Sequence, residues 1–120
     1  MTEGLAAHRM VDVVVPIHGI GPVLVDTLFS IFDQVRDTFG MRCLVVVDGC
    51  PTIDTTSELL SDIAASDEFD LEVIYQKNSG VIGARNTAIR HILRRERKPD
   101  FVLFVDGDDL VPPNFIEASL

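Results

Sequence analysis

The sequence contains no tryptophan, one tyrosine and two cysteines among its 120 residues. Two cysteines are too few for a disulfide scaffold, and the spacing of Cys43 and Cys50 matches no zinc or redox motif. We therefore expect reduced thiols, as in a cytoplasmic protein.

Positive charge is also scarce. Ten lysines and arginines stand against nineteen aspartates and glutamates, which gives a formal net charge of −9. A chain this acidic is a poor candidate for binding a nucleic acid polymer or an anionic lipid surface through its overall field. Phosphate ligands are not excluded, because a bound divalent cation reverses the local field.

Long apolar runs are missing as well, since none approaches the ~18 residues that a membrane-spanning helix needs. The N-terminal MTEGLAAHRM lacks the cationic start and apolar centre of a signal peptide. We expect a cytoplasmic chain, which a longer parent protein could still attach to a membrane through a segment beyond Leu120.

Apolar residues are plentiful, at 47%, and they gather in four short runs at 11–15, 42–48, 71–76 and 101–106. Stretches with helical periodicity separate these runs, at 22–39, from about 54, and at 80–97. The alternation predicts an α/β fold, with a Rossmann-like parallel sheet and helices on both faces. We expect one domain over residues 1–120. The nearly continuous apolar runs 42–48 and 101–106 predict strands buried on both faces.

Ligands of open parallel sheets bind beyond the carboxyl ends of the strands. The segments that follow the four predicted strands are rich in glycine, proline and polar residues, so all four could line one cleft. They read PIHG, DGCPTIDTT, KNSGVIGARN and DGDDL.

The last of these segments places Asp106, Asp108 and Asp109 within four positions. Ionised carboxylates this close repel one another, and a divalent cation removes the repulsion. Carboxylates are suitable hard-oxygen ligands for Mg²⁺ or Mn²⁺, whose shells waters and substrate phosphates then complete. Alternatively, Asp106 and Asp108 cap the next turn and Asp109 is solvated.

The third segment, NSGVIGARN, suggests an anion site. Gly80 and Gly83 flank a predicted helix start, where free backbone N–H groups and the helix dipole favour negative charge. Arg85 lies where the dipole disfavours a cation, which a bound phosphate would explain. Otherwise Arg85 extends into solvent or pairs with the acidic segment. A metal site and an anion site on one cleft suggest a nucleoside diphosphate.

Four stretches now resemble a known family. VVVPIHG, VVVDGCPTIDTTSELL, NSGVIGARNTAI and FVLFVDGDDLVPPNFIE stand in the order and spacing of the nucleotide-binding half of the GT-A-fold inverting glycosyltransferases of family 2. The resemblance covers residues 11–117. Each motif alone is weak evidence for the family, but four motifs in this order are strong evidence together. The resemblance implies a nucleotide-sugar donor, most often a UDP-sugar, and a chain that is the N-terminal part of a longer enzyme.

The resemblance also implies roles for particular residues. Pro16 and Ile17 would form the edge of the nucleoside pocket, Asp48 would contact the base, and Arg85 would lie near the base or diphosphate. Asp106 and Asp108 would be the D-x-D pair that holds Mn²⁺ or Mg²⁺, with Asp106 also near the ribose.

The sequence departs from the family pattern in two loops. The second loop reads DGCPTID where the family has DDGSxD, and Asp54 is either a helix cap or a nucleoside contact. The first loop has no Asn or acidic residue near Gly19, where the family usually has one. His18 there could touch the ligand, but a lone loop histidine is interpreted as incidental. The general base that activates the acceptor hydroxyl is expected beyond Leu120. The acceptor (saccharide, lipid or protein) and the oligomeric state are left open.

Three other functions compete with this one. A phospho-acceptor receiver domain would need an acidic pair where the sequence has PIHG, and a fifth strand followed by a lysine. A non-catalytic nucleotide-binding module would share the donor site. An α/β interaction module would bind no nucleotide at all.

Overall fold

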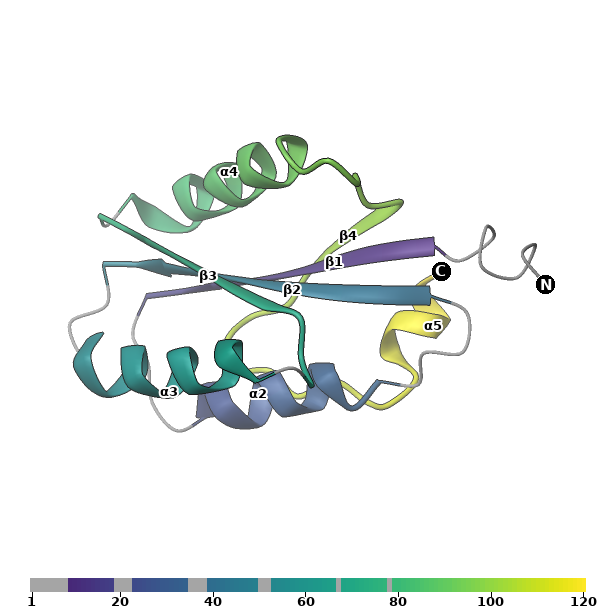
Figure 1. Cartoon of the computed structure of the whole chain (residues 1–120), viewed down its shortest axis with the longest axis horizontal. Helices are drawn as coiled ribbons and strands as arrows, with labels where there is room; N and C mark the ends of the chain where they lie inside the picture. The colour runs from purple at the N-terminus through teal and green to yellow at the C-terminus, as the bar shows by residue number, and fades with distance from the viewer. Residues whose placement is uncertain (1–8, 19–22, 35–38, 50–52, 67, 78) are drawn as a thin grey trace.

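The computed structural model describes residues 9–18, 23–34, 39–49, 53–66, 68–77 and 79–120, and side chains within these ranges except at 53–57. Strands and helices alternate along the chain (Figure 1). The elements are β1 (Arg9–Ile17), α2 (Val23–Phe32), β2 (Phe39–Asp48), α3 (Ile53–Ala65), β3 (Leu71–Gln76), α4 (Gly80–Leu93), β4 (Phe101–Phe104) and α5 (Phe115–Ser119).

The strands form one parallel sheet in the order β3-β2-β1-β4. Helix α4 covers one face, and α2, α3 and α5 cover the other (Figure 1). The predicted α/β fold with helices on both faces is therefore confirmed. Among the described residues, no helix has the length and apolar character to cross a membrane.

Side chains of the central strands point alternately to the two faces of the sheet and contribute to two hydrophobic cores. Val11, Val13 and Val15 of β1 point toward α2 and α3, and belong to the larger cluster. Val14 points the other way and packs with Ala88 of α4 in the smaller cluster. Because side chains alternate between faces along a strand, a continuous apolar run serves both cores at once.

Two predicted helix boundaries are wrong. The helix expected over 22–39 ends at Phe32, and Phe39 begins β2 as a buried strand residue. Spacing alone does not distinguish another helical turn from the first residue of a buried strand. Helix α4, the third helix expected from the sequence, ends at Leu93, four residues before its expected end at Arg97.

Strand β4 is not the buried strand that its apolar sequence predicted. It has four residues, pairs with β1, and lies at the edge of the described sheet. Phe101 is 38% exposed and Phe104 is 37% exposed. Arg9 lies over the Phe101 ring and Arg85 over the Phe104 ring, with guanidinium carbons 5.6 Å and 5.0 Å from the ring centroids. An apolar run predicts a strand, but it does not reveal how many neighbours the strand has.

A cluster of charged side chains lies between α4 and the sheet, near the amino ends of the strands. Asp12 is completely buried and accepts two hydrogen bonds from Arg42, at 2.6 Å and 3.0 Å. Arg95 Nη1 lies 3.0 Å from Asp12 Oδ1, close enough for an ion pair but without hydrogen-bond alignment. His91 on α4 and Arg95, just beyond the end of that helix, both contact Glu72 on β3. The cluster therefore joins the end of α4 and the residues after it to three strands.

Of the two cysteines, only Cys43 lies among the described residues. Cys43 is a free thiol buried in β2, and Cys50 lies outside the described residues. Burial raises the pKa of Cys43 to about 12, with Asp70 raising it further and Arg95 lowering it. Because the thiolate is the reactive form, Cys43 is inert at neutral pH.

Candidate functional site

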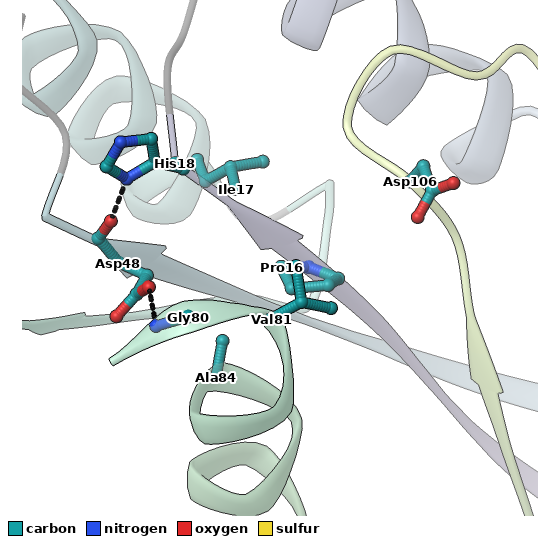
Figure 2. A pocket seen from close by; sticks show the side chains of 8 residues that line it. All are labelled: Pro16, Ile17, His18, Asp48, Gly80, Val81, Ala84 and Asp106. Carbon is teal, nitrogen blue, oxygen red and sulfur yellow. Dashed lines mark hydrogen bonds between the residues drawn. The ribbon is translucent and has the colours of Figure 1, made fainter. Parts of the chain in front are cut away.

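A cavity of about 370 Å³ opens at the carboxyl ends of the strands. Each of the four segments that follow a strand contributes to it, which confirms the prediction that they line one cleft. Figure 2 shows Asp106 on the opposite side of the cavity from His18 and Asp48. The lining residues are Pro16, Ile17, His18, Asp48, Gly80, Val81, Ala84 and Asp106.

The end of β1 supplies one wall through Pro16, Ile17 and His18. His18 Nδ1 lies 2.6 Å from the backbone oxygen of Asp48. A carbonyl only accepts hydrogen bonds, so Nδ1 must carry the proton. His18 was interpreted as incidental, yet it borders the cavity and links the first two loops. The sequence signal that could have indicated this role is the location of His18 immediately after a buried strand, where ligands of parallel sheets bind.

Asp48, at the end of β2, is almost completely buried, with 3% of its surface exposed. Its Oδ1 accepts from Gln76 Nε2 at 2.9 Å and from the Ser79 amide at 2.8 Å. Its Oδ2 accepts from the Gly80 amide at 2.9 Å. The sheet register brings Gln76 directly beside Asp48. Ser79 occupies the N-cap position of α4, but its side chain makes no capping bond. The Asp48 carboxylate, at the end of β2, therefore caps the start of this helix instead.

These contacts also set the ionisation of Asp48. Burial by itself would raise the pKa of the carboxyl group. Hydrogen bonds from Gln76, Ser79 and Gly80 outweigh burial, the nearby His18 adds to them, and the pKa of Asp48 is lowered below its usual value. Asp48 is therefore a stable carboxylate at neutral pH.

The start of α4 is not the open anion site that the sequence suggested. The amide groups of Ser79 and Gly80 are two of the donors at this helix start, and both already donate to Asp48. Gly80 has φ +80°, a conformation that glycine adopts without strain. The expectation of free N–H groups at Gly80 is therefore wrong, because the anion at this helix start belongs to the protein.

Arg85 lies on α4 one turn beyond Val81, and its side chain is exposed. Its guanidinium group stacks on Phe104 of the edge strand rather than lining the cavity. The position leaves the charged end of Arg85 at the boundary between α4 and β4. The structure thus shows a cation–π contact in place of the alternatives of free solvation and pairing with the acidic segment.

The acidic segment forms a turn in which the Asp109 amide donates to the Asp106 carbonyl at 3.0 Å. One carboxylate oxygen from each of Asp106, Asp108 and Asp109 lies within 4.8 Å of the others, and all three residues are exposed. Gly107 packs so tightly against Ile17 that a Cβ atom would overlap Ile17 Cγ2. Three exposed carboxylates give an open, oxygen-only donor set that fits Mg²⁺ or Mn²⁺.

The Glycosyl transferase family 2 model matches residues 12–120. The chain belongs to this family. Family 2 membership confirms the resemblance found in the four sequence motifs, and it sets aside the receiver domain.

Family 2 relatives match most of this chain. The chain is 31% identical over 102 residues to "Uncharacterized glycosyltransferase EpsJ" of Bacillus subtilis (strain 168), covering 85% of this chain and 27% of EpsJ. It is 32% identical over 105 residues to "Succinoglycan biosynthesis protein ExoW" of Rhizobium meliloti (strain 1021), covering 87% of this chain and 31% of ExoW. The chain therefore spans about a third or less of the length of these relatives.

Solved structures share the fold. Residues 1–349 of S. aureus TarS, in a complex with UDP-GlcNAc, superpose with a TM-score of 0.72 at 24% identity, over 92% of this chain and 30% of that one. The mannosyltransferase PcManGT of Pyrobaculum calidifontis, in a complex with GDP-Man and Mn²⁺, gives a TM-score of 0.70 at 25% identity, over 88% and 29%. The fold of this family 2 chain is thus that of the GT-A glycosyltransferases.

Proposed function

We propose that this chain binds the sugar-nucleotide donor of a family 2 glycosyltransferase together with a divalent metal, Mn²⁺ or Mg²⁺. The carrying observation is the cavity at the strand ends, which has the buried carboxylate of Asp48 on one side and the acidic turn on the other. The parent enzyme would transfer the sugar to an acceptor hydroxyl with inversion. TarS and PcManGT, whose structures contain sugar nucleotides, support the ligand class.

In this proposal the nucleoside lies against Pro16 and Ile17. A carboxylate has about four acceptor positions, and Asp48 uses three of them within the protein. One remains on Oδ2, enough to accept a single hydrogen bond from a base N–H such as that of uracil. The base would therefore be held by a group that is already rigid, which lowers the entropic cost of binding.

Asp106 and Asp108 would hold the metal, with Asp109 beside them. When bound, the metal neutralises the negative charge that develops on the diphosphate leaving group. Asp106 borders the cavity, so it would contact the ribose or a metal-bound water there. The general base and the acceptor site are proposed to lie in a further segment, since the relatives extend well beyond the matched region.

We expect Asp108→Asn to remove the metal-dependent part of UDP binding, because the variant loses one of the two proposed carboxylate ligands. In the wild type, Mn²⁺ with UDP at ~100 times the dissociation constant should stabilise the fold by about 2.7 kcal/mol. Thermal unfolding with UDP, with and without Mn²⁺, measures the effect. Asp62→Asn, which changes an exposed carboxylate on α3, is the control and should behave like the wild type. An undiminished Mn²⁺-dependent shift in Asp108→Asn would refute the metal assignment.

Arg85 is proposed to approach the diphosphate by leaving Phe104 when a nucleotide binds. Arg85→Ala should then weaken UDP binding by about 1.5–3 kcal/mol, the scale of a hydrogen bond to a charged group. Isothermal titration calorimetry measures the change. Arg90→Ala removes an exposed arginine farther along the same helix and should leave affinity unchanged. Equal losses of UDP affinity in both variants would mean that Arg85 acts only through its contribution to the overall electrostatic field and not through a direct contact.

A further inference from the structure

Helix α2 and the two residues after it carry a polar stripe, defined here as Thr27, Ser30 and Gln34. Their spacing of three and four places them on one side of the helix. Thr27 is completely buried and Gln34 is 5% exposed, although both are polar. Buried polar groups are retained where they have hydrogen-bonding partners, and here the partners lie about eighty residues further along the chain.

Each member of the stripe bonds to the backbone of the segment that begins with the acidic turn. Thr27 Oγ1 donates to the Gly107 carbonyl at 3.0 Å, and Ser30 Oγ accepts from the Val111 amide at 3.2 Å. Gln34 Nε2 donates to the Pro112 carbonyl at 2.7 Å, and Gln34 Oε1 accepts from the Ile116 amide at 2.9 Å. The backbone from 105 to 114 lies outside helices and strands, so these side chains supply partners that regular structure does not.

The contact with Gly107 bears directly on the metal site. The Gly107 carbonyl lies between Asp106 and Asp108 in sequence, so fixing its direction fixes the backbone from which both side chains extend. Thr27 Oγ1 is also 3.2 Å from the Val23 carbonyl, but its single proton has the shorter contact with Gly107. Ile17 packs against the same glycine. The turn is therefore held by a hydrogen bond and by close packing.

We propose that Thr27 is a positioning residue for the acidic turn, and that the polar stripe keeps Asp106 and Asp108 in the arrangement that a divalent cation requires. The proposal rests on the proposed function above. Repulsion between the carboxylates favours their separation when no cation is bound. A buried hydrogen bond that opposes this separation prepares the site, so less ordering is needed when the metal and the nucleotide bind.

The test compares Thr27→Val with Thr27→Ser. Valine keeps the shape but removes the hydroxyl, and serine restores the hydroxyl. Mn²⁺ affinity is measured in saturating UDP by the electron paramagnetic resonance signal of free Mn²⁺. We expect the valine variant to bind Mn²⁺ about tenfold more weakly, the lower end of the effect of removing a group that orients a metal ligand. The serine variant should recover most of the wild-type affinity.

Thr87→Val is the matched control, because the Thr87 hydroxyl also bonds to a carbonyl, that of Gly83 in its own helix, at 3.0 Å. It should retain the wild-type Mn²⁺ affinity. Binding of uridine without metal, followed by nuclear magnetic resonance titration, should be the same in the wild type and in Thr27→Val. A purely structural role would instead weaken uridine and Mn²⁺ binding together, and that result would overturn the proposal.

The outcomes separate this inference from the function on which it rests. If the wild type binds no Mn²⁺ in the presence of UDP, both fail. If the wild type binds Mn²⁺ and Thr27→Val binds it equally well, the positioning role fails and the proposed function stands. If Thr27→Val does not fold, Ser30→Ala replaces it, because it removes the acceptor of the Val111 amide from the same stripe. Ser30→Ala should then weaken Mn²⁺ binding and spare uridine, and unchanged Mn²⁺ affinity would contradict the inference.

Discussion

Replacing Asp12 with alanine is expected to lower the free energy of unfolding by about 3–5 kcal/mol, the cost of breaking a buried ion pair by removing one partner. The side chain is completely buried beneath α4 and faces both Arg42 and Arg95. Alanine would leave two guanidinium groups beside a new cavity, where the half-exposed Glu72 still pairs with Arg95. Small domains are stable by roughly 5–15 kcal/mol, so this loss is a large fraction of the total.

Urea unfolding followed by circular dichroism measures this change. Asp62→Ala, on the exposed side of α3, is the control and should change stability by less than about 0.5 kcal/mol. A triple variant, Asp12→Leu with Arg42→Met and Arg95→Met, should recover much of the loss, because an apolar replacement leaves no charge unpaired. A small effect of Asp12→Ala would show that water reaches the two arginines.

We expect Asp48→Ala to destabilise the fold by about 3 kcal/mol and also to weaken nucleotide binding. Three donors lose their acceptor, two of them at the start of α4, and hydrogen bonds to a charged group contribute roughly 1.5–3 kcal/mol each without being additive. The pKa of Asp48 is lowered in the folded chain. Its contribution is therefore present at neutral pH and is lost as the pH falls through that lowered pKa.

Denaturation of the wild type and Asp48→Ala at neutral and acidic pH measures the loss of stability and its pH dependence. The difference in free energy of unfolding between the two proteins should shrink in acid. Ser79→Ala distinguishes a local cap from a distant one. Ser79 is the residue that precedes α4, yet its hydroxyl bonds to the Lys77 carbonyl. A loss in Ser79→Ala as large as that in Asp48→Ala would mean that the capping group has been misidentified.

The sequence was informative where a residue's role depends on its near neighbours. Apolar runs and the helical periods between them predicted the strands, and parallel pairing then predicted that Asp48 and Asp106 would meet at one edge. The spacing of Asp106, Asp108 and Asp109 also predicted that their carboxylates would lie close together. Phe39 was misassigned because an apolar residue at helical spacing is equally suited to opening a buried strand.

What the sequence could not predict depends on contacts between distant residues. Asp48 caps a helix that begins about thirty residues later, and no local motif marks that pairing. Thr27 bonds to Gly107 across eighty residues. The edge position of β4 follows from strand order, which an apolar pattern does not encode. The functional roles of Pro16, Ile17, Asp48, Arg85, Asp106 and Asp108 remain predictions for binding experiments.

The pairing of β1 with β4 has a consequence for how the chain folds. Arg9 pairs with Phe39 across thirty residues, whereas Val11 pairs with Phe101 across ninety. Loop-closure entropy grows with the logarithm of length, so the longer closure costs about 1 kcal/mol more. Once β2, β3 and α4 have docked, fewer residues between β1 and β4 remain unordered, so closing this loop costs less entropy. Strand β4 is therefore expected to join the sheet last. The acidic turn follows β4 directly, so the cation site would be completed at the end of folding and lost first when the chain opens locally.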